Sequence, residues 1–267
     1  MLVVPVPDAA ALDREAARIV AHRVREKPTI TLGLPSGSTP LGMYRGLIRL
    51  HREEGLDFAR VTAFNLDEYL GLAPTHPRTV HRFMREAFFD HVNVPVSQIH
   101  VPDGTAADLE ASCADYERRI AEAGGIDLPV LGIGRCGHIG VNEPASSLAS
   151  RTRVKTLTAA TMEDTRRQFG AGEPGPECAI TMGIGTILEA RHILLLGAGG
   201  AKREAVARAI EGPVTATVTA SALQLHPHVT ALLDREAAAG LRHLDHYERV
   251  MHTTATVTPD RFARPTG

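Results

Sequence analysis

The chain has 267 residues, of which 43% are hydrophobic, and its formal net charge is −2 at pH 7. This near-neutral balance, the absence of tryptophan and an aromatic content of only 4% argue against binding to a nucleic acid or a charged membrane surface. Three widely spaced cysteines argue against a disulfide framework, and no apolar run approaches the length that spans a membrane. We therefore expect a soluble cytoplasmic protein in which residues 1–267 form a single domain.

The first part of the chain predicts strands and helices in alternation. Residues 2–6 predict a strand, and Asp8 is suitably placed to cap the helix that follows. Apolar residues from Leu12 onward recur at helical spacing. Residues 29–34 predict a second strand, which leads directly into a loop of small polar residues.

This loop is a candidate anion site. It ends at Pro40, which suits the first turn of a helix. Its other residues include Ser36, Gly37, Ser38 and Thr39. A small polar loop between a strand and a helix N-terminus offers free N–H groups to a phosphate, although an ordinary turn would use the same residues. The loop has neither a Walker A lysine nor the dinucleotide glycine pattern, so we expect neither ATP nor NAD.

Two adjacent acids follow the next predicted strand, residues 60–65. In open parallel sheets, ligands bind beyond the carboxyl ends of the strands, which is where Asp67 and Glu68 lie. A base is therefore expected here. Since the two acids are neighbours, we expect only one to point inward, while the other caps a helix or faces solvent.

A glycine-rich stretch follows an apolar run at residues 129–133, which predicts a buried strand. Four glycines between Gly132 and Gly140 allow the backbone to turn sharply and approach a ligand. His138 lies among them and Glu143 follows. A carboxylate that orients an imidazole makes a proton-transfer pair, although a loop histidine bonded to a carbonyl would show the same pattern.

A second candidate phosphate site lies near the C-terminal end of the chain. Residues 191–196 predict an apolar strand that runs into a glycine-rich turn ending at Lys202. The same lysine could simply begin a solvated helix. His226 and His228 lie two residues apart, but no third metal ligand is spaced with them, so we expect both to be structural. The alternation of strands and helices as a whole predicts an α/β fold with a mostly parallel central sheet and helices on both faces.

Three sequence motifs resemble those of the glucosamine-6-phosphate deaminases, a family of amino-sugar phosphate isomerases. They are F-N-x-D-E-Y-x-G-L at 64–72, G-H-I-G-x-N-E-P-A-S-S-L-A-S-R-T-R at 137–153 and S-A-L-Q-L-H-P-H at 221–228. The resemblance implies a modified Rossmann-like fold. It also implies conversion of glucosamine 6-phosphate to fructose 6-phosphate and ammonia, with no cofactor and no metal, in a chain that could form a homo-oligomer.

The resemblance further implies residue roles. Asp67 would be the enolisation base, and His138, oriented by Glu143, would open the sugar ring. The expected phosphate ligands are Ser36, Gly37, Ser38, Thr39, Arg167 and Lys202. The positions that form an allosteric site in some family members are Ser146, Arg153 and Lys155.

Two departures from the family pattern bear on function. Arg78, Thr79 and Val80 replace the family's E-S-Y in a lid over the sugar. Cys136 stands where the family has an aspartate near the histidine. Three functions are then open. The protein could be a deaminase in which Glu143 alone sets the charge and orientation of His138, a diverged paralogue acting on a related amino-sugar or sugar phosphate, or a sensor that binds a sugar phosphate with little turnover.

The residues around Cys136 are those of a proton-transfer site. They therefore favour neither a nucleophilic Cys136 nor a metal held by Cys136, His138 and Glu143. A sugar-phosphate lactonase is a more distant alternative, because it shares the fold and part of the glycine–histidine loop.

Overall fold

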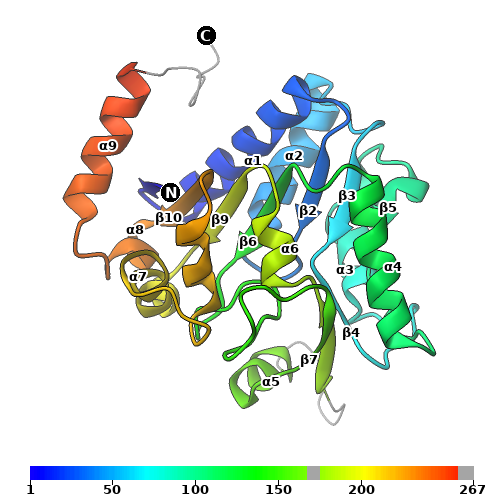
Figure 1. Cartoon of the computed structure of the whole chain (residues 1–267). Helices are drawn as coiled ribbons and strands as arrows, with labels where there is room; N and C mark the ends of the chain where they lie inside the picture. Colours follow the sequence, from blue (N-terminus) through cyan, green and yellow to red (C-terminus); the bar gives the residue numbers. More distant parts are fainter. Residues whose placement is uncertain (167–174, 258–267) are drawn as a thin grey trace.

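The computed structural model describes residues 1–166 and 175–257. A seven-stranded sheet, with every pairing parallel, forms the centre of this part, in the spatial order β1-β10-β9-β6-β2-β3-β5 (Figure 1). Its strands are β1 (Leu2–Val6), β2 (Thr31–Leu34), β3 (Thr62–Asn65), β5 (Ile99–His100), β6 (Leu128–Gly132), β9 (Ile193–Gly197) and β10 (Val229–Asp234). The predicted parallel α/β sheet is confirmed.

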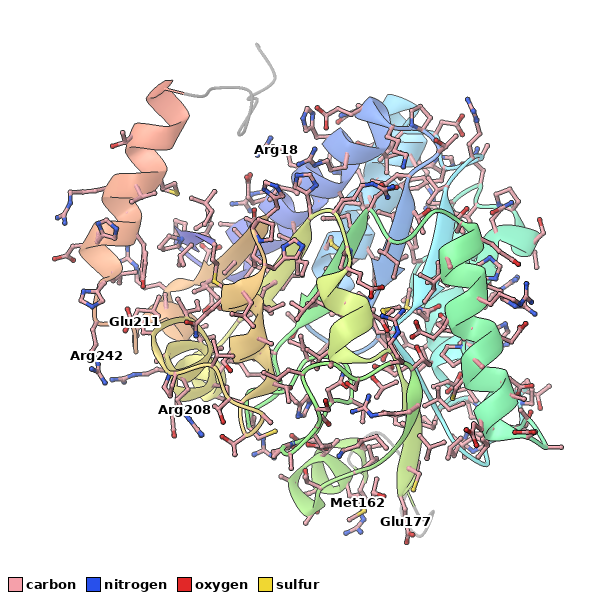
Figure 2. All side chains as sticks on the ribbon, viewed as in Figure 1. Arg18, Met162, Glu177, Arg208, Glu211 and Arg242 are labelled. Atoms are coloured by element: carbon pink, nitrogen blue, oxygen red, sulfur yellow. The ribbon has the colours of Figure 1, made fainter. Side chains whose placement is uncertain are left out.

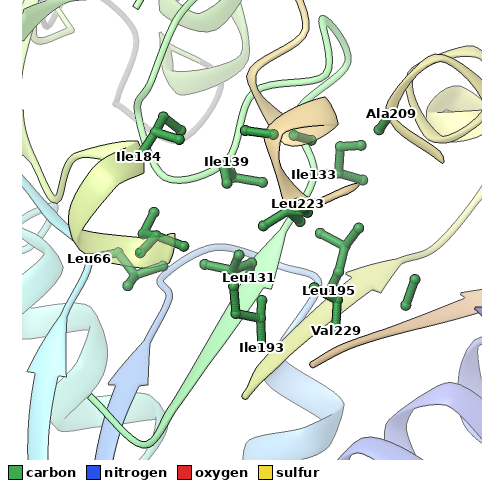
Figure 3. Packing of buried hydrophobic residues seen from close by; sticks show 14 of the residues in the cluster. Leu66, Leu131, Ile133, Ile139, Ile184, Ile193, Leu195, Ala209, Leu223 and Val229 are labelled. Carbon is green, nitrogen blue, oxygen red and sulfur yellow. The ribbon is translucent and has the colours of Figure 1, made fainter. Parts of the chain in front are cut away.

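The central strands are apolar along their whole length because both faces of the sheet are covered. Successive side chains of a strand point to opposite faces. Leu194 and Leu196 of β9 therefore belong to one hydrophobic core, and Ile193 and Leu195 belong to the other. Figure 3 shows Ile193, Leu195 and Leu131 packed in the second core. This two-sided burial explains the continuous apolar runs in the sequence.

Helices pack on both faces, as predicted (Figure 1). The core on one face includes side chains of α1 (Ala9–Glu26), α2 (Leu41–Glu54) and α3 (Val80–Ala87). The core on the other includes side chains of α4 (Leu109–Glu122), α6 (Ile184–Leu188), α7 (Arg203–Glu211), the 3-10 helix η4 (Thr219–Leu225) and α8 (Arg235–Ala238). Asp8 caps α1, as predicted, because its carboxylate accepts a hydrogen bond from the Ala11 amide.

Five further helical segments complete the part of the chain that the structure describes. They are η1 (Phe89–His91), η2 (Val96–Gln98), α5 (Ala159–Arg166), η3 (Gly200–Lys202) and α9 (Leu244–Val257). The segment before α9 is held to α7 by Glu211, whose carboxylate accepts hydrogen bonds from the Arg242 and His243 amides. Figure 2 labels Glu211 and Arg242 on this side of the molecule. Within residues 1–166 and 175–257, no helix is both long and apolar enough to cross a membrane.

A second, antiparallel sheet was not predicted. It consists of β4 (Asp67–Tyr69), β8 (Cys178–Thr181) and β7 (Arg153–Thr156), with β8 in the middle. The sequence analysis predicted only the mostly parallel central sheet and did not assign these three strands to a sheet of their own. A strand of three residues is too short to show a hydrophobic period, so β4 was not recognised as a strand at all.

The sheet order places a topological switch point between β2 and β6, and the space beyond the carboxyl ends of these two strands is called the crevice below. From β2 the chain moves outward to β3 and β5, whereas β6 lies on the other side of β2 and is followed by β9 and β10. The loops that leave the carboxyl ends of β2 and β6 therefore run in opposite directions. Such a switch point is where open α/β sheets bind their ligands.

Helices α1 and α2 pack closely because α2 carries a glycine at the contact. A Cβ atom at Gly46 would lie 2.7 Å from the Cβ of Ala17, which is buried. We expect Gly46→Leu to lower the free energy of unfolding by about 1–3 kcal/mol through overpacking, even though leucine favours helix more than glycine does. Urea denaturation measures this change. The exposed Arg49→Ala in the same helix is the control, with an expected change within about 0.5 kcal/mol. Equal stability of the two variants would contradict the packing argument.

Candidate active site

Asp67 lies at the crevice, in the first position of β4. Its Oδ1 atom accepts a long hydrogen bond, 3.4 Å, from Ser36 Oγ in the loop after β2. Although Asp67 keeps some contact with solvent, burial is the main cause that raises its pKa, followed by the negative charge of Glu68. The Ser36 hydrogen bond and the His138 cation lower it, and the resulting pKa is about 7. Asp67 is therefore a stronger base than an ordinary aspartate.

Glu68 has a structural task instead. Its side chain is buried and accepts hydrogen bonds from the amides of Tyr69, Val80 and His81 at 2.8, 2.8 and 2.9 Å. Two of these amides belong to the first turn of α3, where intrahelical partners are lacking. One acid of the pair thus caps a helix, as predicted.

Of the three residues at 78–80 that depart from the family pattern, two have structural roles and one is exposed. Thr79 is buried, and its hydroxyl accepts from the Arg82 amide as the N-cap of α3. Val80 is part of the hydrophobic core. Arg78 alone is exposed. Two of the three expected lid contacts are therefore structural positions of α3.

The loop after β6 sets the position of His138. The Gly134 amide donates to the His138 carbonyl at 2.8 Å, and Gly137, at φ +83°, donates to the Gly134 carbonyl at 2.9 Å. A Cβ atom at Gly134 would lie 2.3 Å from both Cε1 and Nε2 of His138. The imidazole ring therefore packs directly against Gly134, which only glycine permits.

Three side chains of this loop converge on one point. His138 Nδ1 lies 2.9 Å from Cys136 Sγ and 3.3 Å from Glu143 Oε2, and Cys136 Sγ lies 3.7 Å from the same Glu143 oxygen. With Nδ1 engaged in this way, Nε2 is the ring nitrogen that a ligand can reach. Nε2 has no hydrogen-bond partner within the described residues.

The other carboxylate oxygen of Glu143, Oε1, is also hydrogen-bonded, which holds the side chain in place. This side chain is almost fully buried, and Oε1 accepts from the Thr158 amide at 3.1 Å and the Thr158 hydroxyl at 3.2 Å. Burial raises the Glu143 pKa, but the hydrogen bonds to His138 and to the threonines and the positive charge of His138 lower it to about 2. Thr158 lies fifteen residues along the chain, so no local pattern could have identified it.

The charge of His138 follows from its neighbours. Burial lowers the His138 pKa, whereas the hydrogen bonds and charges of Cys136 and Glu143 raise it to about 9. The Glu143 carboxylate contributes to this rise throughout the neutral range, whereas Cys136 adds charge only as the thiolate. An imidazolium paired with the Glu143 carboxylate is therefore favoured in the unliganded protein.

Two of the expected phosphate ligands interact with the residues described above, Ser36 through its hydrogen bond to Asp67 and Lys202 through the charge of Cys136. The loop from Ser36 to Thr39 leads into α2, with Gly37 at φ +95°. Lys202 lies in η3, and burial lowers its pKa, while the charges of Asp164 and Cys136 raise it and that of Arg135 lowers it. Lys202 is thus electrostatically coupled to the His138 loop. Arg167 lies outside the described residues.

Two of the three expected allosteric residues contact the segment that carries Glu143, because the Ser146 amide donates to the Glu143 carbonyl at 3.1 Å and Arg153 Nη1 donates to Asn142 Oδ1 at 3.0 Å. Arg153 and Lys155 point to the same face of β7, since they are two residues apart in a strand. Within the described part of the chain, neither Ser146 Oγ nor Arg153 Nη2, both buried, has a hydrogen-bond partner. Arg153 also lines a cavity of about 720 Å³ between α4 and β7, which none of the catalytic candidates lines.

His226 is structural, as predicted, whereas the side chain of His228 is exposed. His226 is buried, with Nε2 at 2.8 Å from the Ala190 carbonyl. The His228 amide donates to Nδ1 of the same ring at 3.1 Å. Both ring nitrogens of His226 are therefore engaged with the backbone.

Residues 7–232 match the model of a family described as glucosamine-6-phosphate isomerases/6-phosphogluconolactonase. The chain belongs to this family. It is 48% identical over 250 residues to a glucosamine-6-phosphate deaminase of Cellvibrio japonicus (strain Ueda107), covering 94% of this chain and 95% of the relative. The family resemblance read from the three motifs is thereby confirmed.

Solved structures agree with this assignment. A monomeric glucosamine-6-phosphate deaminase superposes with a TM-score of 0.88 at 46% identity, covering 90% of this chain and 100% of that one. A 6-phosphogluconolactonase from Trypanosoma cruzi gives a TM-score of 0.72 at 21% identity, covering 90% and 97%. The second likeness concerns the fold alone.

The packing of His138 on Gly134 can be tested directly. We expect Gly134→Ala to displace the imidazole from Glu143, so that the pKa of His138 falls from about 9 toward the ordinary value of about 6.5. An NMR titration of the imidazole measures it. Gly132→Ala is the matched control, because a Cβ atom there meets no atom within 4 Å. An unchanged midpoint in Gly134→Ala would show that the ring does not depend on this contact.

The raised pKa of Asp67 predicts a pH-dependent stability. Between about pH 4 and pH 7 the folded state keeps a proton on Asp67 that the unfolded state has lost, so rising pH destabilises the wild type. Asp67→Asn has no titrating group at this position, so its stability does not fall with pH for this reason. We expect its stability relative to the wild type, from urea denaturation, to rise by about 2–3 kcal/mol between pH 5 and pH 8. A constant difference would mean that Asp67 titrates normally.

Proposed function

We propose that this protein converts glucosamine 6-phosphate and water to fructose 6-phosphate and ammonia. The observation that carries the proposal is one crevice with a carboxylate of pKa about 7, Asp67, and an imidazolium–carboxylate pair, His138 and Glu143. Two titratable groups whose environments move their pKa values apart are what a reaction with separate proton transfers needs. The deaminase relatives described above support the same assignment.

His138 would open the sugar ring. The pyranose opens when a proton reaches the ring oxygen and another leaves the anomeric hydroxyl. The protonated imidazole can donate from Nε2 to the ring oxygen, after which the neutral ring can accept the anomeric proton at the same nitrogen. Glu143, bonded at Nδ1, keeps the ring oriented in both states.

Asp67 would carry out the isomerisation. The open-chain substrate must lose the proton at C2. The electron pair of that C–H bond forms a C1=C2 double bond, while the aldehyde oxygen takes up a proton, which the His138 imidazolium can donate, to give the enol. Asp67 can take this proton and return it at C1, and water then displaces ammonia from the resulting imine. Burial makes the carboxylate basic enough to accept a carbon-bound proton.

The phosphate would bind at the Ser36–Thr39 loop and at Lys202, together with Arg167. The helix N-terminus at α2 supplies N–H groups and a favourable dipole for the dianion. Ser146, Arg153 and Lys155 remain a proposed allosteric site. Catalysis without a cofactor, a cytoplasmic location, a single domain and a homo-oligomeric state are parts of the same proposal.

Cys136 leaves two further functions to consider. A thiol in place of a carboxylate changes the charge beside His138, as would suit a paralogue acting on a related sugar phosphate or a sensor that binds without turnover. The position of Glu143 favours the deaminase, because its carboxylate lies 3.3 Å from His138 Nδ1 and supports the imidazolium where position 136 has no aspartate.

The direct test is an assay with glucosamine 6-phosphate, without added metal or nucleotide, that follows ammonia and fructose 6-phosphate together. We expect equal release of both by the wild type. Asp67→Asn should abolish exchange of the C2 proton with solvent while phosphate affinity stays within about threefold, because it removes only the base. Exchange that persists in Asp67→Asn would assign the base elsewhere, and a measurable dissociation constant with no turnover by the wild type would favour the sensor.

A further inference from the structure

We propose that Cys136, His138 and Glu143 also form a binding site for Zn²⁺, and that the bound ion switches off ring opening. The inhibitory role rests on the proposed function, whereas the metal site stands on its own geometry. The sequence pattern did not favour a metal held by these three residues, whereas their geometry supports one, and the ion proposed here would inhibit the reaction rather than take part in it.

The three donor atoms already lie at distances close to those of a zinc site. Sγ, Nδ1 and Oε2 are all within 4.8 Å of one another. Tetrahedral zinc with ordinary bond lengths separates such donors by about 3.3–3.6 Å. The observed separations are 3.3 Å for Nδ1–Oε2, 3.7 Å for Sγ–Oε2 and 2.9 Å for Nδ1–Sγ. Only the last must widen, by about 0.6 Å, which a small rotation of the Cys136 side chain achieves.

The surroundings hold two of the three ligands in position. Thr158 binds Oε1 of Glu143 through its amide and hydroxyl, so that Oε2 is directed at the other two donors. Gly134 supports the face of the His138 ring. Hydrogen bonds of this kind to a ligating carboxylate strengthen metal binding.

The site also has an open side. Cys136 and His138 both keep partial exposure to solvent, whereas Glu143 is buried beneath them. An ion can therefore enter from the crevice and keep a water molecule as its fourth ligand. Three protein ligands with one open position are typical of accessible zinc sites.

The donor set selects the type of metal. A thiolate is a soft ligand that favours Zn²⁺ over Mg²⁺, Ca²⁺ or Mn²⁺. Binding releases the thiol proton of Cys136 and the Nδ1 proton of His138. The thiolate and the carboxylate then balance the two positive charges of the ion, so the filled site is neutral.

The bound ion would block proton transfer at a stated atom. With Zn²⁺ at Nδ1, the neutral imidazole carries its remaining proton on Nε2. Transfer of this proton to the ring oxygen would leave an imidazolate, so Nε2 is a far weaker acid than in the imidazolium. While it keeps the proton, Nε2 cannot accept the anomeric proton either. Zn²⁺ should therefore lower kcat in proportion to occupancy.

Binding is tested on the full chain in metal-free buffer with a phosphine reductant, using Co²⁺ as a spectroscopic probe and Zn²⁺ as the competitor. We expect a near-ultraviolet thiolate-to-cobalt band with one ion per chain, which Zn²⁺ removes. Cys136→Ser should lose the band and bind Zn²⁺ at least about 100-fold more weakly. Cys178→Ser, which changes another partly exposed cysteine, is the matched control and should bind as the wild type does. A band that is missing in the wild type or that persists in Cys136→Ser overturns the site.

Inhibition is tested in the deamination assay after chelator treatment. We expect the metal-free wild type and Cys178→Ser to be inhibited by Zn²⁺, and any activity that Cys136→Asp retains to be at least tenfold less sensitive. Deamination by a wild type that binds no Zn²⁺ overturns the metal site alone. Zn²⁺ binding by a metal-free wild type that never deaminates overturns the proposed function and the inhibitory role together.

Discussion

The parallel pairing of β2 with β6 is the constraint on which the site depends. Leu32 lies opposite Leu128 and Gly33 opposite Pro129. A Cβ atom at Gly33 would lie only 3.0 Å from Pro129, so glycine permits the close approach of the two strands. After β2 the chain turns to one side of this strand pair, and after β6 it turns to the other. The Ser36–Thr39 loop and the His138 loop therefore leave the same edge of the sheet and face one crevice.

Burial raises the pKa of both carboxylates along that edge, but their partners lead to opposite outcomes. Asp67 has only a weak hydrogen bond and a like-charged neighbour, so desolvation raises its pKa. Glu143 is more deeply buried, yet the hydrogen bonds to His138 and the threonines outweigh desolvation and lower its pKa. The pKa is thus about 7 for Asp67, where desolvation dominates, and about 2 for Glu143, where the hydrogen bonds and the positive charge of His138 outweigh it. This difference in pKa suits Asp67 to act as a base and Glu143 to orient His138.

The antiparallel sheet links the site to the rest of the chain. Asp67 pairs with Thr181 of β8, and Arg153 of β7 pairs with the same residue on its other side. Thr181 also accepts a hydrogen bond from the Val141 amide in the His138 loop. One strand therefore positions the base, the His138 loop and the face that carries Arg153, which offers a physical route between the proposed allosteric residues and the crevice.

The sequence by itself determined the parallel α/β fold, the strand ends that carry Asp67 and His138, and the family. Apolar runs and motifs are local patterns, and the rule that ligands bind at carboxyl strand ends turns them into a site. Only the tertiary structure decided that Glu68 caps α3, that Thr158 holds Glu143, and that β4, β7 and β8 leave the main sheet. Each of these depends on contacts between residues twelve or more positions apart, or on a strand too short to show a period.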